Sequence, residues 1–145
     1  MKIENLFRFI RHPKKIPNIS SILFCYISKN IISADELFHS LNQQLNLQVF
    51  GGNWDALMDT LCDFEDVKKK YIIIMHETTS MNNNILFYYL SCLMAAALTW
   101  KKYSNEHIFL PIFSENDKEK IIKILYSDKL QRRFEIICND LHLNE

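Results

Sequence analysis

Apolar side chains occur in three short continuous runs along the chain, at residues 22–27, 71–75 and 107–113. Runs of this length are typical of strands that are buried on both faces within a parallel sheet. Pro111 lies in the third run and has no N–H to donate to a neighbouring strand, which predicts a position at or near a sheet edge. The pattern therefore predicts three buried strands, the last of them near an edge.

Helical periodicity fills the segments between these runs. Ser33 and Glu36 have the spacing of a capping box and predict the start of a helix. Further helices are predicted over residues 53–62 and residues 84–102. Because strands alternate with helices, we expect an α/β fold, with a small three-stranded parallel sheet flanked by helices. The apolar positions of the first helix are Leu37, Phe38, Leu41 and Leu45.

Both ends of the chain lie outside this pattern, which predicts an N-terminal arm at residues 1–19, a domain at residues 20–113 and a C-terminal helical extension at residues 114–145. In the arm, residues 6–10 are apolar enough for one or two helical turns. Ser114 is placed to cap the first helix of the extension. The apolar stripe of its second helix packs on the domain or forms an oligomer contact. The residues of this stripe are Leu130, Phe134, Ile137 and Leu141.

Charge is balanced over the whole chain but unevenly distributed along it. The 17 basic and 17 acidic residues cancel, so no general attraction to nucleic acid or anionic lipid is implied. Residues 1–20 nevertheless carry five bases and one acid, whereas residues 47–66 carry five acids and no base. The neutral total therefore conceals an acidic segment with basic neighbours.

The cysteines and the longest apolar segment both point to a cytoplasmic protein. Cys25, Cys62, Cys92 and Cys138 are far apart and lack the spacing of a zinc site, which favours reduced, buried thiols. Residues 85–100 form an apolar segment that is shorter than the roughly 20 residues needed to span a bilayer. We therefore expect a buried core helix there, no membrane partner, and no metal or other cofactor.

Both glycines of the chain, Gly51 and Gly52, directly precede the acidic segment. Because glycine accepts positive φ, their position predicts a special turn ahead of a helix. On that helix Trp54, Leu57 and Leu61 share one face and form its predicted buried stripe.

Three aspartates continue along another face of the same helix. Asp55 and Asp59 are four residues apart, and Asp63 follows one turn later. Like charges at this spacing repel each other slightly, so the row does not favour the helix itself. Spacing alone leaves three interpretations open: a solvated acidic face, a catalytic or metal site completed by His76, or a protein interface in which carboxylates imitate phosphates.

Residues 35–61 resemble the barstar family of ribonuclease inhibitors. The resemblance implies a three-stranded parallel sheet flanked by helices, with the second helix and the loop before it plugging a ribonuclease active site. By position, Asp59 is implied to enter the phosphate pocket of the nuclease, and Asp55 to pair with basic residues beside that pocket. The residues that carry the resemblance are Phe50, Gly51, Asn53, Asp55, Ala56, Leu57, Asp59 and Leu61.

The function that we expect is therefore inhibition rather than catalysis: a bacterial immunity protein or antitoxin that binds a cognate ribonuclease toxin, with no direct contact to nucleic acid. The alternatives are a metal-assisted phosphoesterase and a regulatory module that docks through the C-terminal helices. The oligomeric state is left open. Besides Asp55 and Asp59, the residues predicted at the toxin-binding surface are Val49, Phe50, Gly51, Gly52, Asn53, Met58, Asp63 and Phe64.

Overall fold

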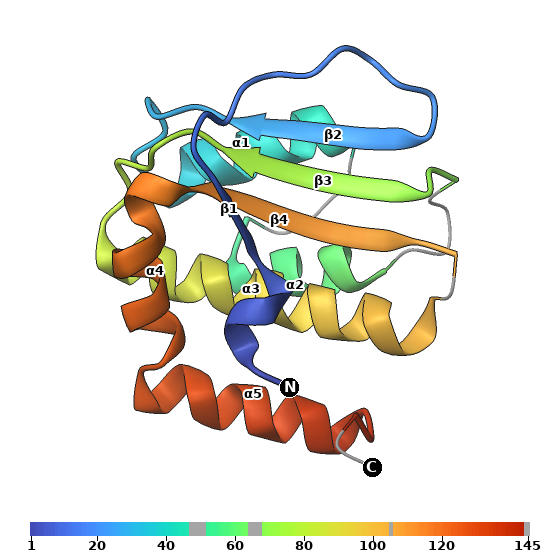
Figure 1. Cartoon of the computed structure of the whole chain (residues 1–145), viewed down its shortest axis with the longest axis vertical. Coiled ribbons are helices and arrows are strands. Elements are labelled where there is room, and N and C mark those ends of the chain that lie inside the picture. Colours follow the sequence, from blue (N-terminus) through green and yellow to red (C-terminus); the bar gives the residue numbers. More distant parts are fainter. Residues whose placement is uncertain (47–51, 64–67, 105, 144–145) are drawn as a thin grey trace.

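The computed structural model describes residues 1–46, 52–63, 68–104 and 106–143. It contains one four-stranded parallel sheet in the order β1-β4-β3-β2, packed with helices (Figure 1). The strands are β1 (Arg8–Ile10), β2 (Ile22–Ile27), β3 (Tyr71–His76) and β4 (Ile108–Ser114). The helices are α1 (Ala34–Leu45), α2 (Trp54–Cys62), α3 (Asn83–Tyr103), α4 (Lys118–Leu125) and α5 (Asp128–Asp140), with short 3₁₀ helices η1 (Ile3–Leu6) and η2 (Glu115–Asp117).

The predicted α/β architecture and its three strands are confirmed, but a fourth strand joins the sheet from the N-terminal arm. The expected helical turns at residues 6–10 are wrong: η1 ends at Leu6, and β1 pairs in parallel with β4, with Phe9 opposite Phe113. An extended segment is favoured here because the edge of β4 offers it backbone hydrogen-bond partners. No local sequence pattern in the arm predicts its pairing with β4.

Pro111 lies near the edge of the sheet, as predicted, because β4 is second from the edge and β1 pairs only with the part of β4 beyond Pro111. β4 is placed between β1 and β3, and Pro111 is the register partner of Ile74. The N–H of Ile108 donates to Lys70 O on the β3 side. Because backbone groups of successive residues point to opposite sides of a strand, the backbone nitrogen of Pro111 points to the β1 side. Because β1 begins only opposite Ile112, the missing N–H of Pro111 costs the sheet no hydrogen bond.

The strands bury one face more completely than the other, in contrast to the predicted burial on both faces. In β3, Ile72 and Ile74 belong to the main apolar core, whereas Tyr71 and Ile73 are half-buried on the opposite face. This alternation follows from the two-residue period of a strand. The helices supply the rest of the core from the Ile72 side.

The long helix α3 is the centre of that core, as the sequence predicts for residues 84–102. It contacts β4, α2, α4, α5 and η1, and Figure 1 shows it between the sheet and α5. Its buried side chains surround the whole helix and include Leu86, Leu90, Leu93 and Trp100. Within the described ranges, no helix combines the length and apolarity needed to cross a membrane.

The predicted helix start is confirmed at Ser33, whereas Ser114 caps the 3₁₀ helix η2 ahead of α4 rather than α4 itself. The Ser33 hydroxyl accepts from the N–H of Glu36 and donates to the Glu36 carboxylate, at 3.2 and 2.9 Å. The Ser114 hydroxyl accepts from Asn116 N–H at the start of η2, which leads directly into α4. These bonds satisfy backbone donors that a helix cannot satisfy itself.

A buried histidine links β3 to α3 and β4. His76 is fully buried, with Nδ1 2.7 Å from Ile112 O and Nε2 2.6 Å from the Tyr89 hydroxyl. Because a carbonyl can only accept, Nδ1 carries the proton, and Nε2 accepts from Tyr89. The imidazole also stacks on Phe113, with ring centroids 3.9 Å apart. Burial lowers the pKa of His76 to about 4, although the bond to Ile112 acts in the opposite direction.

This histidine predicts a specific loss of stability in mild acid. The pKa of His76 is about 4 in the folded protein and about 6.5 when unfolded, so its neutral form stabilises the fold fully above pH 6.5. As the pH falls from 6.5 towards 4, we expect a loss of up to about 3 kcal/mol in the free energy of unfolding. Urea unfolding at a series of pH values measures this loss.

The variant His76→Gln, compared with His39→Gln on the exposed side of α1, isolates the contribution of the buried ring. The stability difference between wild type and His76→Gln should shrink as the pH falls, while His39→Gln should follow wild type. If the free energies of unfolding of wild type and His76→Gln changed with pH in parallel, the assignment of a neutral, hydrogen-bonded ring would be contradicted.

Candidate functional site

A turn with a left-handed residue leads into α2. Gly52 has a φ of +71°, and no atom lies within 4 Å of the position that a Cβ would take there. Glycine is therefore required for backbone conformation rather than for space. The next residue, Asn53, caps the helix, because its Oδ1 accepts from Ala56 N–H at 2.8 Å. This cap was not foreseen from the sequence, although Asn is a favoured residue at that position.

The predicted buried stripe holds α2 against the core. Leu57 and Leu61 are buried, and Trp54 is half-buried with its ring against Phe38, at a centroid distance of 4.7 Å. Trp100 on α3 donates its indole N–H to Leu61 O at 2.8 Å. The helix is thus fixed at both ends by packing and hydrogen bonding to neighbouring elements.

The aspartates lie on the exposed side of this fixed helix. Asp55 and Asp59 are exposed, Met58 between them is half-buried, and Asp63 is exposed at the C-terminal end of α2. Within the described parts of the chain, Asp55 and Asp59 form no ion pair and no hydrogen bond. Their charges are therefore solvated and remain available to an external cationic group.

The arrangement costs the protein a little stability. Carboxylates at i and i+4 repel each other by a few tenths of a kcal/mol on an exposed helix. Asp55 lies in the first turn, where the helix dipole favours a negative charge, but Asp59 lies beyond that turn. A mildly unfavourable charge pair on a well-packed helix is consistent with a binding role.

The structure brings together six of the ten residues predicted at this surface. They are Gly52, Asn53, Asp55, Met58, Asp59 and Asp63, all in the turn, on α2 or at its end. The other four, Val49, Phe50, Gly51 and Phe64, lie outside the described residues, so their placement stays a prediction.

His76 is separated from the aspartates with which a metal-assisted site would need to combine it. Both of its ring nitrogens are occupied inside the core, whereas Asp55 and Asp59 are exposed on α2. Among the described residues, no group of three or more His, Cys, Asp or Glu side chains could hold a metal ion. The described residues thus provide no ligand set for the phosphoesterase alternative.

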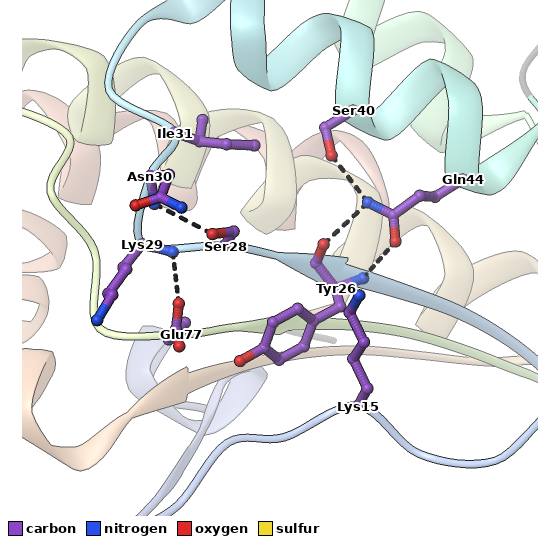
Figure 2. A pocket seen from close by; sticks show the side chains of 9 residues that line it. All are labelled: Lys15, Tyr26, Ser28, Lys29, Asn30, Ile31, Ser40, Gln44 and Glu77. Atoms are coloured by element: carbon purple, nitrogen blue, oxygen red, sulfur yellow. Dashed lines mark hydrogen bonds between the residues drawn. The ribbon is translucent and has the colours of Figure 1, made fainter.

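A shallow polar cleft lies at the carboxyl ends of β2 and β3, and it contains none of the predicted site residues (Figure 2). Its volume is about 520 Å³. The Gln44 side chain accepts from Tyr26 N–H and donates to Tyr26 O, each at 2.8 Å, and so covers the free edge of β2 as another strand would. The cleft is lined by Lys15, Tyr26, Ser28, Lys29, Asn30, Ile31, Ser40, Gln44 and Glu77.

Sequence reasoning missed two exposed side chains beside α2. Tyr88 on α3 is 37% exposed, and its ring stacks on Trp54 at a centroid distance of 5.9 Å. Arg133 on α5 is also exposed and lies over the Phe87 ring, next to Tyr88. The sequence shows Tyr88 only within an apolar run, and its outward direction depends on where α2 and α5 pack.

Comparison with known proteins agrees with this geometry. The family model described as "Barstar (barnase inhibitor)" matches residues 23–115, which include all of α1, α2, α3, β3 and β4 and all but the first residue of β2. No curated protein and no solved structure gives a significant match. With more than half of its length matched, and with an exposed acidic helix held on α3 in a parallel α/β fold, this chain belongs to the barstar family of ribonuclease inhibitors.

Proposed function

We propose that this protein is an immunity protein that binds a cognate ribonuclease toxin and blocks its active site with α2. The observation that carries the proposal is the pair of exposed aspartates, Asp55 and Asp59, on a helix whose other face is fixed in the core. Membership of a family described by inhibition of barnase supports a ribonuclease as the partner.

The proposed mechanism is substitution of a carboxylate for a phosphate. A ribonuclease cleft is lined by cationic donors that bind the phosphates of RNA, and a carboxylate can accept the same charge-assisted hydrogen bonds. Asp59 would enter that pocket, and Asp55 would pair with basic residues beside it. Because α2 is already ordered in the free protein, little conformational entropy is lost when these bonds form.

The free thiols favour a reducing compartment such as the bacterial cytoplasm, where an immunity protein would meet its toxin. Cys25, Cys92 and Cys138 are buried, Cys62 is half-buried, and all four are unpaired. The pKa of Cys25 is raised to about 12 by burial, so this thiol is poorly reactive.

The alternative of docking through the C-terminal helices meets a structural objection. The apolar stripe of α5 packs on the domain, with Leu130 and Phe134 buried and Ile137 and Leu141 half-buried against the core. This stripe is therefore covered by the protein itself and would have to separate from α3 to bind another molecule.

Alanine substitution of the two aspartates tests the proposed mechanism. The tagged protein is purified from the cells that naturally express it, and the ribonuclease that co-purifies is assayed for inhibition by each variant. We expect Asp59→Ala to weaken inhibition by about 30-fold to several thousand-fold, because removal of one partner from a buried charge pair costs about 2–5 kcal/mol, a range to which measurements on barnase–barstar itself contribute. Asp55→Ala should weaken it as well.

Glu119→Ala is the matched control, since Glu119 is an exposed carboxylate on α4, and this variant should inhibit like wild type. Full inhibition by folded Asp59→Ala and Asp55→Ala proteins would overturn the proposal. The proposal would also be overturned if no ribonuclease that the protein inhibits co-purified with it.

A second expected outcome concerns the rate of association. An acidic helix and a basic cleft attract each other at long range, so the association rate should fall steeply as salt is raised from about 50 mM to about 500 mM. The slope should be shallower for Asp59→Ala than for Glu119→Ala in stopped-flow measurements. Equal slopes for the two variants would show that α2 does not steer the encounter.

A further inference from the structure

A row of stacked side chains connects α2 with α5 across the surface of α3. Trp54 on α2 stacks on Tyr88 of α3, with centroids 5.9 Å apart and planes at 17°. Tyr88 meets Phe87 edge-on at 5.3 Å, and the guanidinium of Arg133 on α5 lies 5.6 Å from the centre of the Phe87 ring. These four residues, here called the aromatic row, form one continuous series of contacts.

The end of the row is exposed and well ordered by its contacts. Arg133 is exposed, yet its Nη1 donates to the hydroxyl of Ser91 at 2.8 Å, and Ser91 is buried. Guanidinium carries five N–H donors in a planar fork, and this bond is the only one that Arg133 donates within the described residues. Its position is therefore fixed while most of its donors face solvent.

The row lies next to the acidic side of α2. Trp54, which begins the row, directly precedes Asp55, and its carbonyl accepts from the thiol of Cys92 on α3 at 3.4 Å. The pKa of that thiol is raised to about 12, chiefly by burial and further by Cys62 and Asp55, while Arg133 acts to lower it. Asp55 and Arg133 thus come from two helices, α2 and α5, that both pack on α3.

We propose that Tyr88 and Arg133 enlarge the α2 surface and bind the same ribonuclease through a carboxylate at the rim of its active-site cleft. The inference rests on the proposed function above. A guanidinium would be repelled by the basic floor of the cleft, so its partner must lie on the rim and be acidic. Arginine over an aromatic ring binds carboxylates with two parallel hydrogen bonds, and tyrosine and arginine are frequent in interface hot spots.

The contact would give this protein selectivity of its own. Helix α5 lies beyond residues 23–115, so Arg133 is supplied by a segment outside the matched family region. A nuclease that lacks the acidic rim group would leave Arg133 without a partner, and one with a basic group there would be repelled. The acidic helix would then provide the shared mode of inhibition, and the row would select the cognate toxin.

Charge reversal at Arg133 tests the inference, with the neighbouring Arg132 as a matched control. Both arginines are exposed on α5, but only Arg133 belongs to the aromatic row. With the ribonuclease recovered in the preceding experiment as the probe, we expect Arg133→Glu to weaken inhibition at least about tenfold and Arg133→Ala several-fold. Arg132→Glu should remain within about twofold of wild type. Thermal unfolding of each variant, measured alone, shows whether α5 remains packed.

The outcomes separate this inference from the function on which it rests. If Asp59→Ala weakens inhibition while Arg133→Glu and Arg132→Glu behave alike, the second contact is wrong and the inhibitor assignment stands. If Arg133→Glu unfolds, Arg133→Lys is used in its place. Lysine keeps the positive charge but cannot donate two parallel hydrogen bonds, so this variant should still inhibit more weakly than wild type. Wild-type inhibition by Arg133→Lys would overturn the proposed bidentate contact. If Asp59→Ala and Asp55→Ala inhibit fully, both proposals fail.

Discussion

The burial of α3 on all sides is the constraint on which the rest of the molecule depends. A helix that is apolar around its circumference must be covered around its circumference. The sheet covers one side of α3, α2 a second, and α4 with α5 a third. The small residues Ala95, Ala96 and Ala97 let these neighbours approach closely. The orientation of α2 relative to α5 is therefore fixed by one shared helix.

Buried polar side chains such as His76 are hydrogen-bonded within the protein, whereas the carboxylates on α2 form no such bond among the described residues. His76 is buried only because Tyr89 and a backbone carbonyl satisfy both ring nitrogens, and the nearly buried Asp117 accepts from Thr79 N–H at 2.8 Å. Such pairing avoids the cost of an unsatisfied buried polar group. Asp55 and Asp59, by contrast, are exposed and have no partner among the described residues. His76 and Asp117 are thus paired inside the protein, whereas the carboxylates of Asp55 and Asp59 remain available to an external partner.

The segments outside the family match are built into the same structure. The arm contributes β1 to the sheet and η1 to the packing against α3 and α4. The Tyr126 hydroxyl, just after α4, donates to the Glu4 carboxylate in η1 at 2.8 Å, which ties the two ends of the chain together. α5 then packs beside the α3 surface that adjoins α2. The arm thus extends the sheet by one strand, and α5 brings new side chains to the surface beside α2.

The sequence by itself determined the elements whose causes are local. Runs of apolar residues specified β2, β3 and β4, the spacing of Ser33 and Glu36 specified the start of α1, and the four-residue interval between Asp55 and Asp59 placed both carboxylates on one helix face. Each of these features depends on residues that are close in the chain, where periodicity and capping chemistry act directly.

Only the tertiary structure decided what depends on distant segments. The arm became a strand because the edge of β4 lay open to it, and Pro111 is compatible with that pairing because β1 starts beyond it. Likewise, Tyr88 stacks on Trp54 and Arg133 lies over Phe87 only because α2 and α5 both pack on α3. Pairing and packing between segments far apart in the chain leave no periodic signal within either segment, so the sequence pattern could not reveal them.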